Sequence, residues 1–220
     1  MSLKKSIVLL SGGLDSTVNF YKASIETEVI LALTFNYGQR AAAREIEASY
    51  KIAHTKGIKH QVIELNWLAE ITETALVNYE KEIPKLRVDE LDDTFGAAKT
   101  SAEAVWVPNR NGIFINIAAA FAESFEARCI VTGFNIEEGA TFPDNSPAFV
   151  DTVNKCLKFS TLYKPEVISY TSKLNKKEIA LLGKKLNIPF NLIWSCYFGG
   201  AEMCGECESC LRLNRAMEGI

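Results

Sequence analysis

The residues best suited to chemistry near the N-terminus form a short glycine loop, Ser11-Gly12-Gly13-Leu14-Asp15-Ser16. Glycines permit positive φ and let a phosphate approach backbone N–H groups without a Cβ in the way. A helix that begins after the loop adds unpaired N–H donors and a partial positive charge. Ser11, Ser16 and Thr17 could add hydroxyl donors, and Asp15 could cap the helix or hold Mg²⁺. The loop predicts a phosphate site, and a plain strand-to-helix turn is the alternative.

A second group consists of four cysteines with the spacing of metal ligands, Cys196, Cys204, Cys207 and Cys210. The Cys-x2-Cys spacing lets neighbouring sulfurs bind one ion, and Gly205 permits the turn between them. Zn²⁺ takes four thiolates tetrahedrally and leaves no open position, as in a structural site. An iron–sulfur cluster is the alternative, although the fourth cysteine of the bacterial ferredoxin pattern lies downstream and here it lies upstream. The spacing predicts one structural zinc per chain.

Composition restricts the class of protein that carries these two groups. The chain has 220 residues, 48% hydrophobic and 23% charged, with a formal net charge of −3. These values suit one globular domain, or one domain with a small appendage. No long run of Lys or Arg is present, which argues against a stable nucleic-acid partner.

The apolar segments are too short for targeting or membrane insertion. The run 7–10 is shorter than the roughly 7–15 residues of a signal-peptide core, and no stretch reaches the roughly 18 residues of a membrane span. We expect a cytoplasmic protein with no membrane partner, in which cysteines stay reduced. Cys129 and Cys156 are isolated, and we expect both to be small core residues.

The elements that position these groups alternate between apolar strands and helices. This alternation predicts a doubly wound α/β fold with a five-stranded parallel sheet. We expect a nucleotide-binding domain over 1–190 and a small C-terminal zinc-binding segment over 191–220. The segment 66–106 has weak periodicity and is expected to be irregular with short helices. The expected strands are 6–10, 28–35, 59–65, 128–132 and 167–169, and the expected helices are 14–23, 40–56, 111–125, 148–158 and 176–186.

The glycine loop resembles the pyrophosphate loop of the N-type ATP pyrophosphatases. It lacks the Gly-Lys-Ser/Thr of a Walker loop and the Gly-x-Gly-x-x-Gly of a dinucleotide fingerprint. In the resembled superfamily this loop binds the pyrophosphate that leaves when the substrate is adenylated. Together with the four cysteines, the chain resembles the 7-cyano-7-deazaguanine synthase family over nearly its whole length.

Further segments support the resemblance, and two positions depart from it. Residues 33–40, 107–111 and 195–197 match or resemble family segments, as does Phe142-Pro143-Asp144. Asn109 stands where the family usually has Gly, but Asn tolerates the left-handed region. Asn145-Ser146 stands where the family usually has Cys-Arg, which leaves the exact deazapurine open.

The resemblance implies an ATP-dependent ligase that uses Mg²⁺ and makes a nitrile from 7-carboxy-7-deazaguanine and ammonia. We expect catalytic roles for Asp15, Arg110 and Lys176, with a solvated surface position as the alternative for the last two. A carboxylate could accept hydrogen bonds from the guanine-like N1–H and 2-amino groups, and the expected substrate-binding residues are Asn111, Glu137 and Asp144. The expected nucleotide-binding residues are Leu10, Ser11, Gly12, Gly13, Leu14, Asp15, Ser16, Thr17, Thr34, Phe35 and Gly133.

Two other functions fit parts of the sequence. One is an adenylating enzyme that acts on tRNA, of the thiolase or lysidine-synthetase type, although the acidic chain shows no RNA-binding appendage. The other is a non-catalytic nucleotide-sensing module with a zinc segment. A homodimer is a candidate assembly, but the sequence does not decide the oligomeric state.

Overall fold

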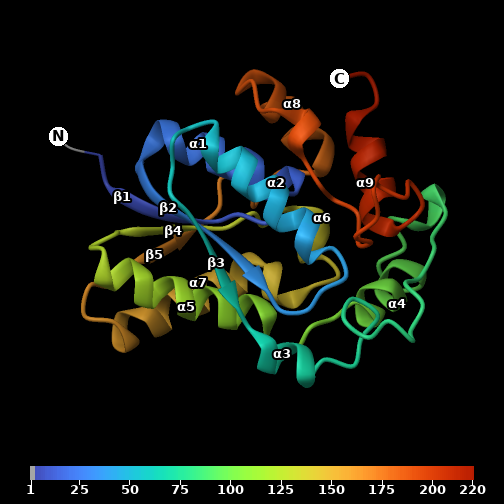
Figure 1. The fold of residues 1–220 in the computed structure, drawn as a ribbon, viewed down its shortest axis with the longest axis horizontal. Helices are drawn as coiled ribbons and strands as arrows, with labels where there is room; N and C mark the ends of the chain where they lie inside the picture. Colours follow the sequence, from blue (N-terminus) through green and yellow to red (C-terminus); the bar gives the residue numbers. More distant parts are fainter. Residues whose placement is uncertain (1–2) are drawn as a thin grey trace.

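The fold is built on a five-stranded parallel sheet (Figure 1). The structure is a computed structural model that describes residues 3–220, so the first two residues of the expected first domain lie outside it. All neighbouring strands pair in parallel, in the order β3-β2-β1-β4-β5. The predicted doubly wound sheet is confirmed. The strands are β1 Lys5–Leu9, β2 Glu28–Asn36, β3 His60–Glu64, β4 Cys129–Val131 and β5 Glu166–Ile168.

Helices cover both faces of the sheet, which makes three layers (Figure 1). Side chains of a strand alternate between faces, so Ile7 packs on one face and Val8 on the other. The Ile7 face is covered by α5 Arg110–Ser124 and α7 Pro147–Ser160. The Val8 face is covered by α1 Leu14–Glu26, α2 Ala42–His54, α8 Lys176–Lys185 and α9 Glu208–Met217.

The order of the strands sets where a ligand can bind. The chain runs from β1 outward to β2 and β3, then returns past β1 to β4 and β5. The connections after β1 and β4 therefore diverge to opposite sides and leave a crevice at the carboxyl edge. The glycine loop follows β1, at this crevice.

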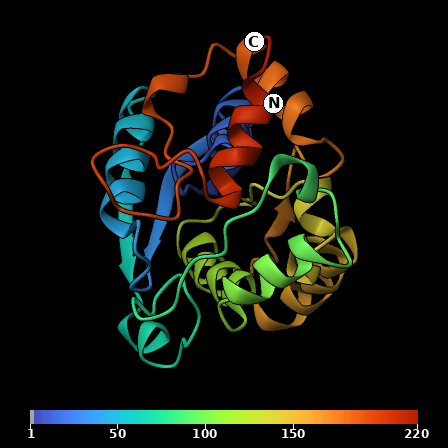
Figure 2. The same cartoon turned by 90° about the vertical axis from the view of Figure 1, so that its right-hand side faces the viewer.

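The segment 66–106, between β3 and α5, holds little regular structure, as predicted. It contains the short α3 Asn66–Glu70, the 3-10 turn η1 Val88–Glu90 and α4 Ala97–Ala104. Figure 2 shows this segment beside α9, and the contacts agree: Arg215 pairs with Asp92 at 2.8 Å. The remaining short elements are α6 Ile136–Gly139, η2 Pro143–Asn145 and η3 Phe190–Leu192.

Several details differ from the sequence-based expectations. The helices α9 and α6 were not predicted. The segment of α9 was interpreted from the spacing of its cysteines, and α6, with four residues, is too short to show a helical period. Cys129 is buried, as expected, but the core position predicted for Cys156 is wrong, because Cys156 lies exposed on α7. Residues of α9 share the hydrophobic cluster of α1 and α8, and the boundary at 190 stays a prediction. Within residues 3–220, no helix is long and apolar enough to cross a membrane.

Candidate active site and metal centre

The glycine loop closes tightly onto the start of α1. Gly12 has φ +79°, and a Cβ there would lie 2.7 Å from the Ala48 Cβ. The Ser16 hydroxyl donates to the Gly13 carbonyl at 3.2 Å, and the Ser11 and Ser16 hydroxyls are 3.1 Å apart. The N-cap of α1 is Gly13, with no side-chain cap. Of the two roles considered for Asp15, the helix cap is therefore wrong, and the magnesium site stays a prediction. The first N–H groups of α1 are left without a side-chain cap and can face an anion.

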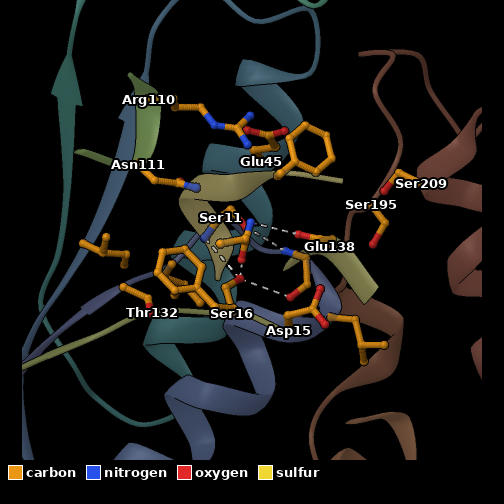
Figure 3. Close-up of a pocket in the computed structure, with 18 of the residues that line it drawn as sticks. Ser11, Asp15, Ser16, Glu45, Arg110, Asn111, Thr132, Glu138, Ser195 and Ser209 are labelled. Atoms are coloured by element: carbon orange, nitrogen blue, oxygen red, sulfur yellow. Dashed lines mark hydrogen bonds between the residues drawn. The ribbon is translucent and has the colours of Figure 1, made fainter. Parts of the chain in front are cut away.

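A cavity of about 260 Å³ opens beside the loop. Its walls come from the carboxyl ends of β1, β2 and β4 and from the first turns of α1, α2, α5 and α9. Figure 3 shows Ser11, Ser16 and Asp15 on one side, Arg110 and Glu45 on another, and Ser195 and Ser209 across from them. A cavity with converging polar groups at this edge of a parallel sheet is a typical ligand site.

Lys176 forms ion pairs with two carboxylates of the cavity, one in the glycine loop and one in α6. It is the first residue of α8, which a capping box of Asn175 and Glu178 begins. Its ammonium group bonds the Asp15 carboxylate and lies 2.5 Å from Glu138 Oε1. Burial raises the pKa of Asp15 to about 6, while the charge of Lys176 opposes this shift. Burial alone would lower the pKa of Lys176, but the two carboxylates outweigh burial and raise it. The second oxygen of Asp15, Oδ1, is buried without a hydrogen-bond partner.

Arg110 and Asn111 begin α5 at the opposite end of the cavity. Asn109, the N-cap, has φ 50° and ψ 30° in the left-handed region, so the change from the family's Gly is tolerated here. Arg110 Nη1 donates to the Tyr37 hydroxyl at 3.4 Å, and Asn111 Nδ2 donates to the Asp144 carbonyl at 3.2 Å. The Arg110 guanidinium keeps further N–H donors for a ligand.

Most of the expected site residues line the cavity. They are Leu10, Ser11, Gly13, Leu14, Asp15, Ser16, Thr34, Phe35, Arg110, Asn111, Gly133 and Lys176.

Four of the expected site residues lie outside the lining. Gly12 supports the turn behind the loop. Thr17 is fully buried, and its hydroxyl donates to the Gly13 carbonyl at 2.7 Å. Because this hydroxyl is engaged inside the helix, it does not face the cavity, contrary to expectation.

The expected substrate carboxylates are also displaced. Glu137 is absent from the lining and is engaged by two cations, since its Oε2 lies 3.2 Å from Arg212 and 3.0 Å from Arg215. Burial raises the pKa of Asp144, but its neighbour Asn145 lines the cavity instead. Neither Glu137 nor Asp144 is among the lining residues, and substrate contact by either stays a prediction.

Sequence reasoning missed several lining residues. Glu138 is the direct neighbour of Glu137, which was predicted. Including both glutamates of this pair among the candidates would have identified it. Glu45 lies in an alanine-rich helix with no local signal. Ser209 and Arg212 follow the last cysteines on the unpredicted α9, and Arg212 donates to Glu208 Oε1 at 2.9 Å.

The four C-terminal cysteines form a compact cluster. Their sulfurs all lie within 4.8 Å of one another, and Gly205 makes the turn with φ +74°. This donor set suits a tetrahedral thiolate metal. The cluster adjoins the cavity on two sides: α9 begins directly after Cys207, and the Trp194 N–H donates to the Gly12 carbonyl at 2.9 Å. A metal bound here would hold two walls of the cavity.

Comparison with known proteins identifies a family that the chain matches over almost its whole length. Residues 5–220 match the model of the family described as "Queuosine biosynthesis protein QueC". The 7-cyano-7-deazaguanine synthase of Carboxydothermus hydrogenoformans is 57% identical over 217 residues, which cover 99% of this chain and 100% of that protein. The synthase of the same name from Desulforamulus reducens is 55% identical over 98% of this chain and 94% of that protein. Among solved structures, NMN synthetase from Francisella tularensis has a TM-score of 0.49 and 13% identity over 99% of this chain and 84% of that chain.

Proposed function

Because the chain belongs to the family of the queuosine biosynthesis protein QueC, we propose that it converts 7-carboxy-7-deazaguanine and ammonia to 7-cyano-7-deazaguanine, using ATP. The observation that supports this most is the glycine loop, which borders a cavity at the crevice of the sheet.

The chemistry explains why such a site suits this reaction. A carboxylate is a poor electrophile, because oxide is a poor leaving group. Attack of a carboxylate oxygen on the α-phosphate releases pyrophosphate and leaves an acyl adenylate, from which ammonia displaces AMP to give the amide. Adenylation of the amide oxygen, followed by loss of a proton and AMP, gives the nitrile. Each step asks the protein for positioning and charge stabilisation.

The lining residues have matching properties. The N–H groups at the start of α1 and the hydroxyls of Ser11 and Ser16 suit the leaving pyrophosphate. Arg110, which lines the cavity, is proposed to stabilise the α-phosphate, and Asn111 and Asn145 can donate to or accept from the base. Asn145 Oδ1 is buried without a partner, so the residue that replaces the family's Cys offers an acceptor to the ligand.

The residues around Lys176 fit a magnesium ion. Mg²⁺ prefers carboxylate and phosphate oxygens, and the unpartnered Asp15 Oδ1 and the nearby Glu138 supply such oxygens. When bound, Mg²⁺ would neutralise charge that develops on the phosphates. Lys176 holds both carboxylates toward the loop.

The cysteine cluster fits structural zinc. Four thiolates complete a tetrahedral ion and leave no position for water or substrate. ATP and reduced thiolates both suit the cytoplasm. A homodimer stays a prediction.

The variant Lys176→Met tests the role of the buried ammonium. The kcat/KM for ATP should fall about 100- to 1000-fold, because a preorganised charge is lost from the phosphate site. Since Lys176 counteracts the raised pKa of Asp15, the acidic limb of the pH–rate profile should move to higher pH. The exposed neighbour Lys177→Met should match wild type in both respects. Equal activity and an unmoved acidic limb in Lys176→Met would exclude Lys176 from the site.

The nitrogen source gives a separate prediction. The proposed steps need only free ammonia, and the four cysteines next to the cavity are assigned here to the metal. Ammonium should therefore support nitrile formation, and glutamine that is free of ammonia should not. The comparison is a rate measurement with each nitrogen source at equal concentration, and equal rates would contradict the proposal.

Pyrophosphate exchange distinguishes the free base from tRNA as substrate. Labelled pyrophosphate should enter ATP when 7-carboxy-7-deazaguanine is present and not when tRNA replaces it. Exchange that depends on tRNA would favour the thiolase or lysidine-synthetase alternative. Tight ATP binding without exchange under either condition would favour the nucleotide-sensing module.

A further inference from the structure

Four carboxylates line the cavity, and three of them are matched by a cation. Asp15 and Glu138 pair with Lys176, and Glu208 pairs with Arg212 at 2.9 Å. Glu45 is the exception: within residues 3–220, no basic nitrogen lies within 4.0 Å of its carboxylate. Under the proposed function the cavity binds two anions, ATP and the deazapurine acid. A carboxylate without a cation is unfavourable there, unless it accepts hydrogen bonds from one of these ligands.

The Glu45 side chain is held in one orientation. It lies in the first turn of α2, where the helix dipole favours a negative charge. Its Oε2 accepts a hydrogen bond from Gln39 Nε2 at 2.8 Å. Gln39 is itself fixed, because the same amide nitrogen donates to the Phe35 carbonyl at 3.0 Å and its Oε1 accepts from the Tyr37 N–H at 2.9 Å. This network leaves Oε1 of Glu45 and the second lone pair of Oε2 for a ligand.

The cavity that Glu45 lines also has a cationic group and an aromatic wall. Figure 3 shows its carboxylate beside the Arg110 guanidinium, although the two are more than 4.0 Å apart. Phe35 and Phe114, which both line the cavity, stack with ring centroids 4.0 Å apart. Burial raises the pKa of Glu45, and the Gln39 amide and the charge of Arg110 oppose the shift. N–H donors from a ligand would favour the charged form in the same way.

We propose that Glu45 recognises the edge of the substrate base that carries the N1–H and 2-amino groups, and so determines the preference for a guanine-like base. This inference rests on the proposed function. Two parallel N–H donors match the two oxygens of one carboxylate, as in other bidentate pairs. Of the carboxylates that line the cavity, Glu45 alone has no ion pair within 4.0 Å. Glu137, which the sequence suggested for this task along with Asp144, is engaged by Arg212 and Arg215.

The variant Glu45→Gln tests this with little change of shape. The glutamine amide presents an oxygen, which accepts, and an NH2 group, which donates. The NH2 group would face one N–H of the base and leave that N–H without an acceptor. The KM for 7-carboxy-7-deazaguanine should rise about 100-fold, because two charge-assisted hydrogen bonds are disturbed. The KM for ATP should stay within about twofold, because the contacts to ATP are unchanged. The matched control is Glu47→Gln, on the same helix but exposed and paired with Arg44 and Lys51.

A substrate analogue and a binding measurement complete the test. Wild type should prefer 7-carboxy-7-deazaguanine over the analogue without the 2-amino group, and Glu45→Gln should lose most of that preference. Calorimetry with the nitrile product should show weaker binding to Glu45→Gln at an unchanged melting temperature. Such binding is a readout that does not depend on turnover.

Four outcomes would overturn the inference. Wild-type turnover with an unchanged KM for the acid in Glu45→Gln would contradict the role of Glu45 alone. A rise in the KM for ATP would place the adenine amino group at Glu45, and a loss of kcat without a change in KM would indicate a proton-transfer role. Wild-type protein that neither binds nor converts the acid would contradict the proposed function itself, and with it this inference.

Discussion

Replacing Gly13 with valine should abolish most turnover and leave the fold intact. Gly13 has φ −76°, which any residue adopts. The atoms nearest to a Cβ there would be the Ser11 Oγ at 3.6 Å, the Trp194 carbonyl oxygen at 3.8 Å and the Ser195 Oγ at 3.9 Å. These are ordinary contacts, so the backbone accepts a side chain. Because Gly13 lines the cavity, the valine methyl groups would occupy the space in which the phosphate meets the loop.

The same change at Gly12 should act on stability first. Its positive φ and the 2.7 Å approach to the Ala48 Cβ leave no room for a side chain. We expect Gly12→Val to lose about 3 kcal/mol, from backbone strain and overpacking together, or about 10 °C in Tm for a chain of this size. Gly13→Val should lose at least about 100-fold in pyrophosphate release with a small change in Tm.

Steady-state pyrophosphate release and thermal denaturation of both variants separate the two effects. Full turnover in Gly13→Val would remove the loop from the active site. A Gly13→Val protein as unstable as Gly12→Val would show that the loop serves the fold rather than the phosphate.

Loss of the metal from the cysteine cluster should strongly lower the stability of the protein. Purified protein should contain about one zinc per chain and be colourless, since four thiolates fill a tetrahedral ion. Cys207→Ser should lose the metal and several kcal/mol of stability, because metal binding at a thiolate site is coupled to local folding. The exposed Cys156→Ser is the control and should keep both metal and stability.

The contacts of the cluster predict how activity responds. Trp194, two residues before Cys196, bonds Gly12 of the loop, and Glu208, next to Cys207, is buried against Ser101 at 2.5 Å. Turnover should therefore fall in proportion to the folded fraction measured under the same conditions. Iron with acid-labile sulfide in a brown protein would contradict zinc. A well-folded, metal-free Cys207→Ser protein without turnover would indicate a direct role of the metal in the reaction.

The features that could be predicted from the sequence are local ones. The loop of Ser11 to Ser16 and the spacing of the four cysteines lie within short stretches, so residue type and spacing alone indicate their chemistry. The five strands follow from continuous apolar runs, because a strand of a parallel sheet is buried on both faces. The strand order then places the loop at the crevice by topology.

The features that sequence reasoning missed depend on contacts between distant segments. Glu45 and Glu208 differ from other helical glutamates only because the fold turns them into the cavity. Glu137 was favoured over Glu138 because the sequence does not reveal that Arg212 and Arg215 engage the former. Cys156 lies on the outer side of α7, and an isolated cysteine in a mixed helix gives no sign of which side is buried.

Mass spectrometry of the reaction product tests the central claim most directly. The protein is incubated with ATP, Mg²⁺, nitrogen-15 ammonium and 7-carboxy-7-deazaguanine. We predict 7-cyano-7-deazaguanine with a single nitrogen-15 atom in the nitrile, and AMP released for each of the two adenylation steps. Unchanged acid after complete incubation of folded, zinc-loaded protein, or release of AMP without any labelled deazapurine, would contradict the account.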